Sequence, residues 1–203
     1  MIDQPSLWRP LLTLILAAVV VMGSPGPSTM SVTAVGAAFG LRRSLRYLSG
    51  LIVGTGAVLI AVATGVVSLL LSVPHAAPVL VAASAAYILY LAYKIATAPP
   101  LSKLDGDVAA PSFAGGFLLA VANPKAYVAI AAVFAGNTLA DTPTPDALLK
   151  TAVLALMIVV IHVAWLLAGT SFSRIFYDPM SARIANIVFA ATLVATAVIA
   201  FMP

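Results

Sequence analysis

Long apolar stretches without any charged residue limit the possible folds of this chain more than any other feature. The longest, from Tyr47 to Tyr93, contains no lysine, arginine, aspartate or glutamate. An α-helix needs roughly 20 apolar residues to cross the hydrocarbon core of a bilayer, and helices satisfy their backbone hydrogen bonds internally, as lipid requires. Only 8% of the residues are charged, against about 25% in soluble domains. The sequence therefore predicts an all-α integral membrane protein surrounded by membrane lipid.

Six segments are apolar and long enough to span a membrane, and together they predict one transmembrane domain, residues 1–203. The stretch Tyr47–Tyr93 is twice too long for one helix, and the prolines of Pro74–Pro78 divide it, because proline disfavours a continued helix. The expected spans lie within Pro10–Leu41, on either side of that division, and at Phe113–Gly136, Thr151–Ser173 and Ile184–Met202.

Lysine and arginine are unevenly distributed between the two sets of connections. The flanks that follow the first, third and fifth spans carry seven of them: Arg42, Arg43, Arg46, Lys94, Lys103, Arg174 and Arg183. The other side has Arg9 and Lys150. Because cytoplasmic loops are enriched in basic residues, we expect the first side in the cytoplasm and both termini outside.

The six spans form two groups of three that enter the membrane in opposite directions, which is the geometry of an inverted repeat. The first repeat covers residues 8–97 and the second residues 113–203, with a cytoplasmic loop at 98–112. Each repeat begins with a helix that is interrupted near mid-membrane, at Ser24–Ser28 and at Asn123–Lys125. Interrupted helices at corresponding places in two halves indicate the binding site of a transporter.

The first break consists of Pro25, Gly26 and Pro27, flanked by hydroxyl side chains on Ser24, Ser28 and Thr29. Two prolines remove two backbone donors and leave carbonyls and amides without helical partners, and these groups need other partners in hydrocarbon. A bound polar solute is one such partner. A proline kink whose backbone groups bond to neighbouring helices is the alternative interpretation.

The second break, Asn123-Pro124-Lys125, places a lysine about midway along a span. A charge there costs at least about 2.5 kcal/mol on insertion scales, so Lys125 should face the bundle interior. Its ammonium group could bind a substrate carboxylate, and its charge could respond to a transported proton. The alternative is a structural lysine that bonds to the carbonyls freed by the two breaks.

His162 lies in the middle of the fifth span, with Trp165 one turn away. Imidazole is the side chain whose ordinary pKa lies near neutrality, so His162 is a candidate for proton coupling together with Lys125. A histidine that merely bonds to a neighbouring helix is the alternative. The spans contain no carboxylate and the chain contains no cysteine, so neither a metal site nor a cofactor is expected.

The chain resembles the LysE/RhtB family of amino-acid exporters in motifs that occur in the family's order from the first span to the fourth. The matching elements are Ser24–Ser28, the glycines Gly36, Gly40, Gly50 and Gly54, the tyrosine-rich end of the third span, and Gly115-Gly116-Phe117 leading into Asn123–Ala126. The phenylalanine-rich continuation often seen after the lysine is absent from Val128–Gly136.

This resemblance implies a secondary exporter of amino acids or their derivatives in the bacterial cytoplasmic membrane, working by exchange for protons. In that interpretation the residues of the two breaks bind a small zwitterion. The alternatives are export of another small solute or a cation, and a non-transport membrane protein. We expect neither enzymatic activity nor nucleic-acid binding, because nothing brings His162 near a serine nucleophile and the basic residues are scattered. The small-residue face Gly50–Gly54 suits helix packing within one subunit or between two, so a homodimer is compatible with it.

Overall fold

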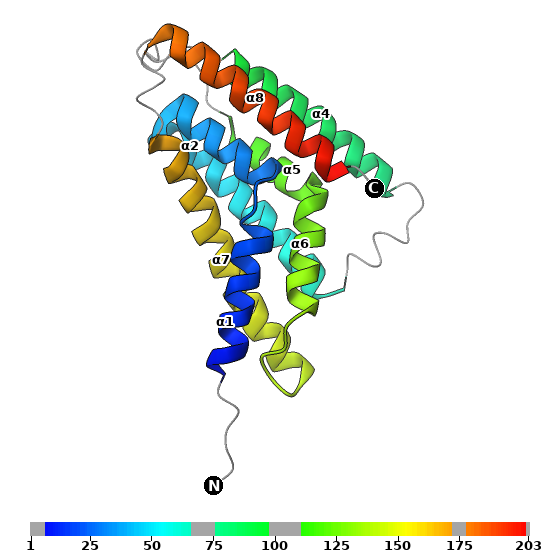
Figure 1. Ribbon diagram of the computed structural model, residues 1–203. Coiled ribbons are helices and arrows are strands. Elements are labelled where there is room, and N and C mark those ends of the chain that lie inside the picture. The colour runs from blue at the N-terminus through cyan, green and yellow to red at the C-terminus, as the bar shows by residue number, and fades with distance from the viewer. Residues whose placement is uncertain (1–6, 66–75, 98–110, 172–177, 202–203) are drawn as a thin grey trace.

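The computed structural model describes residues 7–65, 76–97, 111–171 and 178–201, and all regular structure in these ranges is helical (Figure 1). This confirms the all-α prediction. His75 and the preceding proline of the expected turn, and residues 98–110 of the expected loop, lie outside the described ranges. The elements are α1 (Trp8–Ala17), the π-helix η1 (Ala18–Met22), α2 (Pro27–Ala63), α4 (Ala76–Ala96), α5 (Phe113–Ala122), α6 (Pro124–Ala135), α7 (Pro143–Ser171) and α8 (Pro179–Phe201).

Helix α2 turns back on itself at Gly40, which has a φ of 72° and a ψ of 170°. Hydrogen bonds across the turn show that its two arms lie side by side and antiparallel. The Tyr47 hydroxyl donates to Ser31 Oγ at 3.0 Å, and the Ser44 hydroxyl donates to the Val35 carbonyl at 3.1 Å. The Gly40 turn therefore lies between the residues of the expected first span and those of the expected second span.

Both predicted helix breaks are present. The first separates η1 from α2, which starts at Pro27 after an extended Gly26. The second lies at Asn123, where α5 and α6 meet at a bend of 61°. Proline occupies the first position of α2 and of α6, where its missing N–H costs nothing because that donor has no partner inside a helix.

Glycine allows the helices to approach each other closely. A Cβ atom on Gly50 would lie 2.1 Å from the Phe113 carbonyl oxygen, and one on Gly116 would lie 2.2 Å from the Tyr47 carbonyl oxygen. The backbones of α2 and α5 are therefore in direct contact. The predicted small-residue face at Gly50–Gly54 is used inside the chain, by α5.

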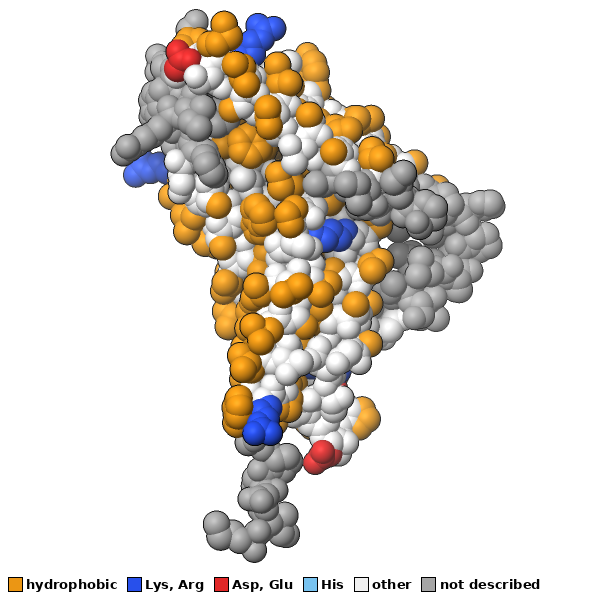
Figure 2. Space-filling view, in the orientation of Figure 1, with side chains coloured by type: hydrophobic (Ala, Val, Ile, Leu, Met, Phe, Trp, Pro, Cys, Tyr) orange, Lys and Arg blue, Asp and Glu red, His pale blue; other side chains and the backbone are white. Residues whose placement is uncertain are grey.

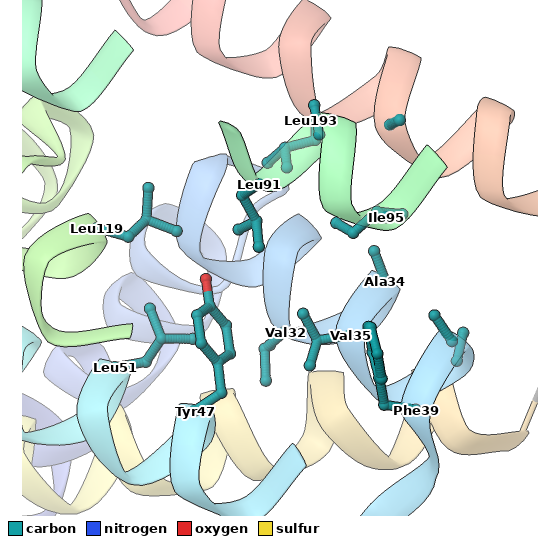
Figure 3. Packing of buried hydrophobic residues seen from close by; sticks show 14 of the residues in the cluster. Val32, Ala34, Val35, Phe39, Tyr47, Leu51, Leu91, Ile95, Leu119 and Leu193 are labelled. Atoms are coloured by element: carbon teal, nitrogen blue, oxygen red, sulfur yellow. The ribbon is translucent and has the colours of Figure 1, made fainter. Parts of the chain in front are cut away.

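Two buried clusters of hydrophobic residues hold the bundle together. In the first, α4 and α8 lie side by side across α2; Leu193 lies beside Leu91, and Ile95 lies near Ala34 of α2 (Figure 3). The second joins α1, η1, the second arm of α2, α6 and α7. Ile52 and Trp165 pack against both clusters.

Two helices of the described chain, Pro27–Ala63 and Pro143–Ser171, are long and apolar enough to cross a membrane, and the bent pair α5–α6 adds a third candidate. The first of these contains the Gly40 turn. Shorter apolar helices lie at Trp8–Met22, Ala85–Ala96 and Pro179–Ala195. Hydrophobic side chains are spread over the whole face shown in Figure 2, while charged side chains lie mainly towards its two ends, with one basic side chain near the middle. This distribution suits a protein embedded in lipid.

Candidate functional site

Hydrogen bonds join the two breaks, although they are about 100 residues apart in the sequence. The Lys125 ammonium donates to the Ser24 carbonyl at 2.5 Å, to Ser24 Oγ at 2.8 Å and to the Pro25 carbonyl at 2.9 Å. An ammonium group has three N–H donors, so these contacts use all of them. The carbonyls freed by the first break are thus partners of the lysine in the second.

Glycine at position 26 makes room for the lysine. A Cβ atom there would lie 2.6 Å from Lys125 Cδ and 2.9 Å from its Nζ. The Gly26 amide donates to Thr29 Oγ1 at 2.9 Å, and the Thr29 hydroxyl bonds back to the Gly26 carbonyl. The Thr29 side chain therefore satisfies the amide of the first break at the start of α2.

Asn123 fixes the second break from both ends of its side chain. Its Oδ1 accepts from the Lys125 amide at 3.1 Å and so caps α6, while its Nδ2 donates to Ser28 Oγ at 2.9 Å. Asn123 and Ser28 are both buried. On the other side, Trp165 Nε1 donates to the Gly23 carbonyl at 3.0 Å, which ties α7 to the first break.

A cavity of about 40 Å³ lies where the two breaks, α2 and α7 meet. The cavity can hold water, because a water molecule needs roughly 10–15 Å³. Its lining combines the polar residues Gly26, Ser28, Thr29, Thr55, Asn123, Lys125 and His162 with the apolar Met22, Ala126, Ala129, Ile130, Ile158 and Ile161. An amino acid is several times larger than a water molecule, so the cavity must widen to admit one.

Two polar atoms on this lining are buried and have no partner among the described residues: His162 Nε2 and Thr55 Oγ1. His162 Nδ1 lies 2.8 Å from the Ile158 carbonyl. A carbonyl oxygen can only accept, so in the neutral ring Nδ1 carries the proton and Nε2 presents a lone pair. Buried polar groups nearly always have partners. A bound solute can supply the partner that each of these two atoms lacks.

The structure brings together most of the residues that the sequence singled out. Lining the cavity are Gly26, Ser28, Thr29, Asn123, Lys125 and His162. Ser24 and Pro25 hold the lysine, and Pro27 and Pro124 start the two helices that follow the breaks. His162 bonds to its own helix rather than to a neighbouring one. Thr55 was missed, because it lies in a stretch of small apolar residues whose pattern indicates only packing.

The sequence is similar to proteins of one known family. The sequence profile of the LysE type translocator family matches residues 19–202. The chain belongs to the LysE family. A relative from Escherichia coli K12, a cysteine/O-acetylserine efflux protein, is 36% identical over 177 residues, covering 86% of this chain and 89% of the relative. Proteins of the same description from Shigella flexneri and from E. coli O139:H28 are 36% and 35% identical over the same lengths.

Membership of the LysE family makes this chain a membrane transporter and confirms that it is not an enzyme. It also confirms the resemblance seen in the motifs around Ser24–Ser28 and Asn123–Ala126. No solved structure matches the chain.

Proposed function

We propose that this translocator exports a small amino acid or amino-acid derivative, of the size and polarity of cysteine or O-acetylserine, from the bacterial cytoplasm in exchange for protons. The observation that carries the proposal is the cavity where two broken helices meet, lined by one ammonium group and by polar atoms that lack partners. The efflux proteins to which the chain is 36% identical favour this substrate class.

The transport pathway in this proposal runs through an inverted repeat of six spans. α1, η1 and the first arm of α2 form the broken first span, and the second arm and α4 complete the first half. The bent pair α5–α6 is the broken fourth span, followed by α7 and α8. The equivalent positions of the two breaks support the repeat, and the basic flanks support an orientation with both termini outside.

The substrate carboxylate binds near Lys125. Lys125 supplies the positive charge of the cavity lining. Hydrogen bonds to a charged group contribute about 1.5–3 kcal/mol each. The ammonium group then exchanges a bond to Ser24 or Pro25 for one to the carboxylate as the cavity widens. Ser28, Thr29 and Asn123, which bond to the protein in the closed cavity, are further candidates for substrate contacts in the widened one.

Export in exchange for protons requires a group that gains and loses a proton while facing the substrate. Lys125 and His162 both line the cavity and both titrate. Protonation and substrate binding must exclude each other at such a group, because a carrier that binds both together would move them in the same direction. His162 meets this condition, whereas Lys125 binds the carboxylate in its protonated form, so we assign proton coupling to His162.

Inside-out membrane vesicles provide the test, since export from the cell becomes uptake into the vesicle. With an acidic lumen, we expect the wild type to accumulate radiolabelled cysteine under reducing conditions, and an uncoupler to prevent this. Lys125→Met should reduce the rate at least tenfold, the factor for losing about 1.4 kcal/mol of a charged hydrogen bond. Lys94→Met, a lysine on α4 outside the cavity lining, is the matched control and should leave uptake unchanged.

Each outcome bears on a different part of the proposal. If the wild type takes up none of a panel of cysteine, O-acetylserine, serine and homoserine, the substrate class is wrong. Accumulation that persists with the uncoupler would contradict proton exchange while leaving export in place. Full activity of Lys125→Met would remove the lysine from the mechanism.

A further inference from the structure

We propose that Thr55 and His162 bind the ammonium group of the substrate, so that this group and a proton compete for the same lone pair on His162 Nε2. The inference rests on the proposed function and names the atoms that would perform the exchange. Thr55 lies on the second arm of α2 and His162 on α7, and both face the cavity between the breaks.

Several polar side chains of the cavity lining already have partners in the protein. Ser28 Oγ accepts from Asn123, Asn123 caps α6, and Thr29 bonds to both backbone groups of Gly26. Thr55 Oγ1 and His162 Nε2, in contrast, are buried without a partner. The exposed fractions of the two residues are only 5% each, so bulk water does not satisfy them. A ligand group that reaches both atoms would relieve this cost.

The two free atoms suit a ligand group that donates hydrogen bonds. With Nδ1–H committed to the Ile158 carbonyl, Nε2 is an acceptor. The Thr55 hydroxyl has two further lone pairs. Both groups are neutral and can accept a hydrogen bond, in surroundings of isoleucine and alanine, and an ammonium group, with three N–H donors, can bond to both. The Thr55 hydroxyl can also donate, but His162 Nε2 accepts only, so the histidine determines the preference for an ammonium group. The carboxylate of a zwitterion would instead need a donor, which Lys125 supplies.

The charge of Lys125 sets the orientation of a bound zwitterion. The Lys125 charge repels an ammonium group and attracts a carboxylate, so a zwitterion in this cavity binds with its carboxylate towards the breaks and its amine towards Thr55 and His162. In the inverted repeat, the two broken spans then supply one end of the site. The two spans that follow them, the second arm of α2 and α7, supply the other.

Protonation of His162 excludes the ammonium group from this subsite, and this links the subsite to proton exchange. When Nε2 takes up a proton, it loses its lone pair and becomes a cationic donor, so it can no longer hold an ammonium group. The proton moves from water to Nε2 as the amine leaves, and returns to water when the next amine binds. Lys125, from α6, is the other titratable group on the cavity lining, while η1 and α2 face it with the non-titrating Met22 and Thr55.

The experiment compares cysteine with mercaptopropionate, which is cysteine with hydrogen in place of its amino group, as competitors of radiolabelled cysteine uptake. The wild type should bind cysteine far better than the deaminated analogue. Thr55→Val keeps the volume of the side chain but lacks the hydroxyl. It should weaken the binding of cysteine about tenfold, the factor expected for a hydrogen bond to a charged group, and should not change the binding of mercaptopropionate. Thr55→Ser should restore the preference, and Thr64→Val, on the same arm but exposed, should not change it.

His162→Gln tests the competition with protons. Glutamine can place an oxygen acceptor near the position of Nε2 but does not titrate. In the wild type, acidifying the substrate side from about pH 7.5 to about pH 5.5, across the ordinary imidazole range, should raise the KM for cysteine with little change in maximal rate. In His162→Gln the KM should become independent of pH, and a pH gradient should no longer drive accumulation.

The outcomes separate this subsite from the proposed function. If the wild type transports cysteine, and Thr55→Val prefers cysteine over mercaptopropionate as strongly as the wild type does, the ammonium subsite alone is overturned. A pH-dependent KM that survives in His162→Gln would overturn the competition at Nε2. Absence of transport by the wild type would overturn the proposed function and, with it, the inference.

Discussion

At the scale of single residues, the junction of the two breaks depends on Asn123. Its side chain caps α6 through Oδ1 and bonds to the first arm of α2 through Nδ2. A capping bond alone contributes about 1 kcal/mol. The second bond is buried, so its loss would leave Ser28 Oγ without that donor inside the bundle.

We therefore expect Asn123→Ala to lower the free energy of unfolding by about 2 kcal/mol. The midpoint of thermal unfolding in detergent, followed by tryptophan fluorescence, should fall by about 4–8 °C for a chain of this size. Asn123→Ser, which offers an oxygen to the cap but is too short to reach both partners, should cost roughly half as much.

Ser112→Ala is the matched control, because Ser112 caps α5 through Gly115 and makes no bond to the other break. It should lose about 1 kcal/mol, as a cap alone does. A loss in Asn123→Ala no greater than that in Ser112→Ala would show that the bond to Ser28 contributes nothing.

The sequence predicted most site residues but not their partners. A lysine in mid-span and prolines in two helices are visible without a structure, since each breaks a rule of membrane helices. Which carbonyls Lys125 binds depends on how two distant segments pack, and no local pattern encodes that. Thr55 was not predictable because a threonine in an apolar helix normally bonds to its own backbone, and its unpaired state follows only from the fold.

At the scale of secondary structure elements, the turn at Gly40 is the feature on which the fold depends most. Its φ of 72° and ψ of 170° fall in a region that is essentially restricted to glycine. A Cβ atom there would meet nothing within 4 Å. The requirement for glycine is therefore one of backbone conformation, not of space.

Gly40→Ala should accordingly destabilise the protein by about 1–3 kcal/mol through backbone strain alone. Gly56→Ala is the matched control, since a Cβ atom on Gly56 also meets nothing within 4 Å but its backbone is helical. Alanine there should be neutral or stabilising by up to about 1 kcal/mol. Thermal unfolding of both variants in detergent measures the difference, and equal midpoints would contradict a conformational role for Gly40.

The elements were predictable to different degrees. Proline patterns predicted both breaks, and the arms of α2 meet between the expected first and second spans. The π-helical turn at Ala18–Met22 was not predicted, because it has no composition of its own. It ends at the first break, where Trp165 binds the carbonyl of Gly23, and this contact comes from a helix more than 100 residues away.

At the scale of the whole molecule, α7 connects two chemically different ends. Gly36 lies against Leu166 and Thr170 near the C-terminal end of α7, so the Gly40 turn and the arginines after it belong to that end. At the N-terminal end, Lys150 forms a salt bridge of 2.7 Å with Asp146 and donates to the carbonyls of Phe134 and Asn137. His162 lies between them, about 18 Å along the helix from Lys150 at 1.5 Å per residue.

This polarity leads to a prediction about orientation that the chain is well suited to test, because it contains no cysteine. Asp141, exposed in the connection between α6 and α7, should lie outside the cell, and Met180, 68% exposed at the start of α8, should lie in the cytoplasm. The start of α8 and the end of α4 lie together at the upper end of the molecule, opposite the start of α1 and the α6–α7 connection (Figure 1). A membrane-impermeant maleimide should therefore label Asp141→Cys in intact cells. Met180→Cys should react only in inside-out vesicles, and the reverse pattern would place both termini in the cytoplasm and contradict the assignment from basic residues.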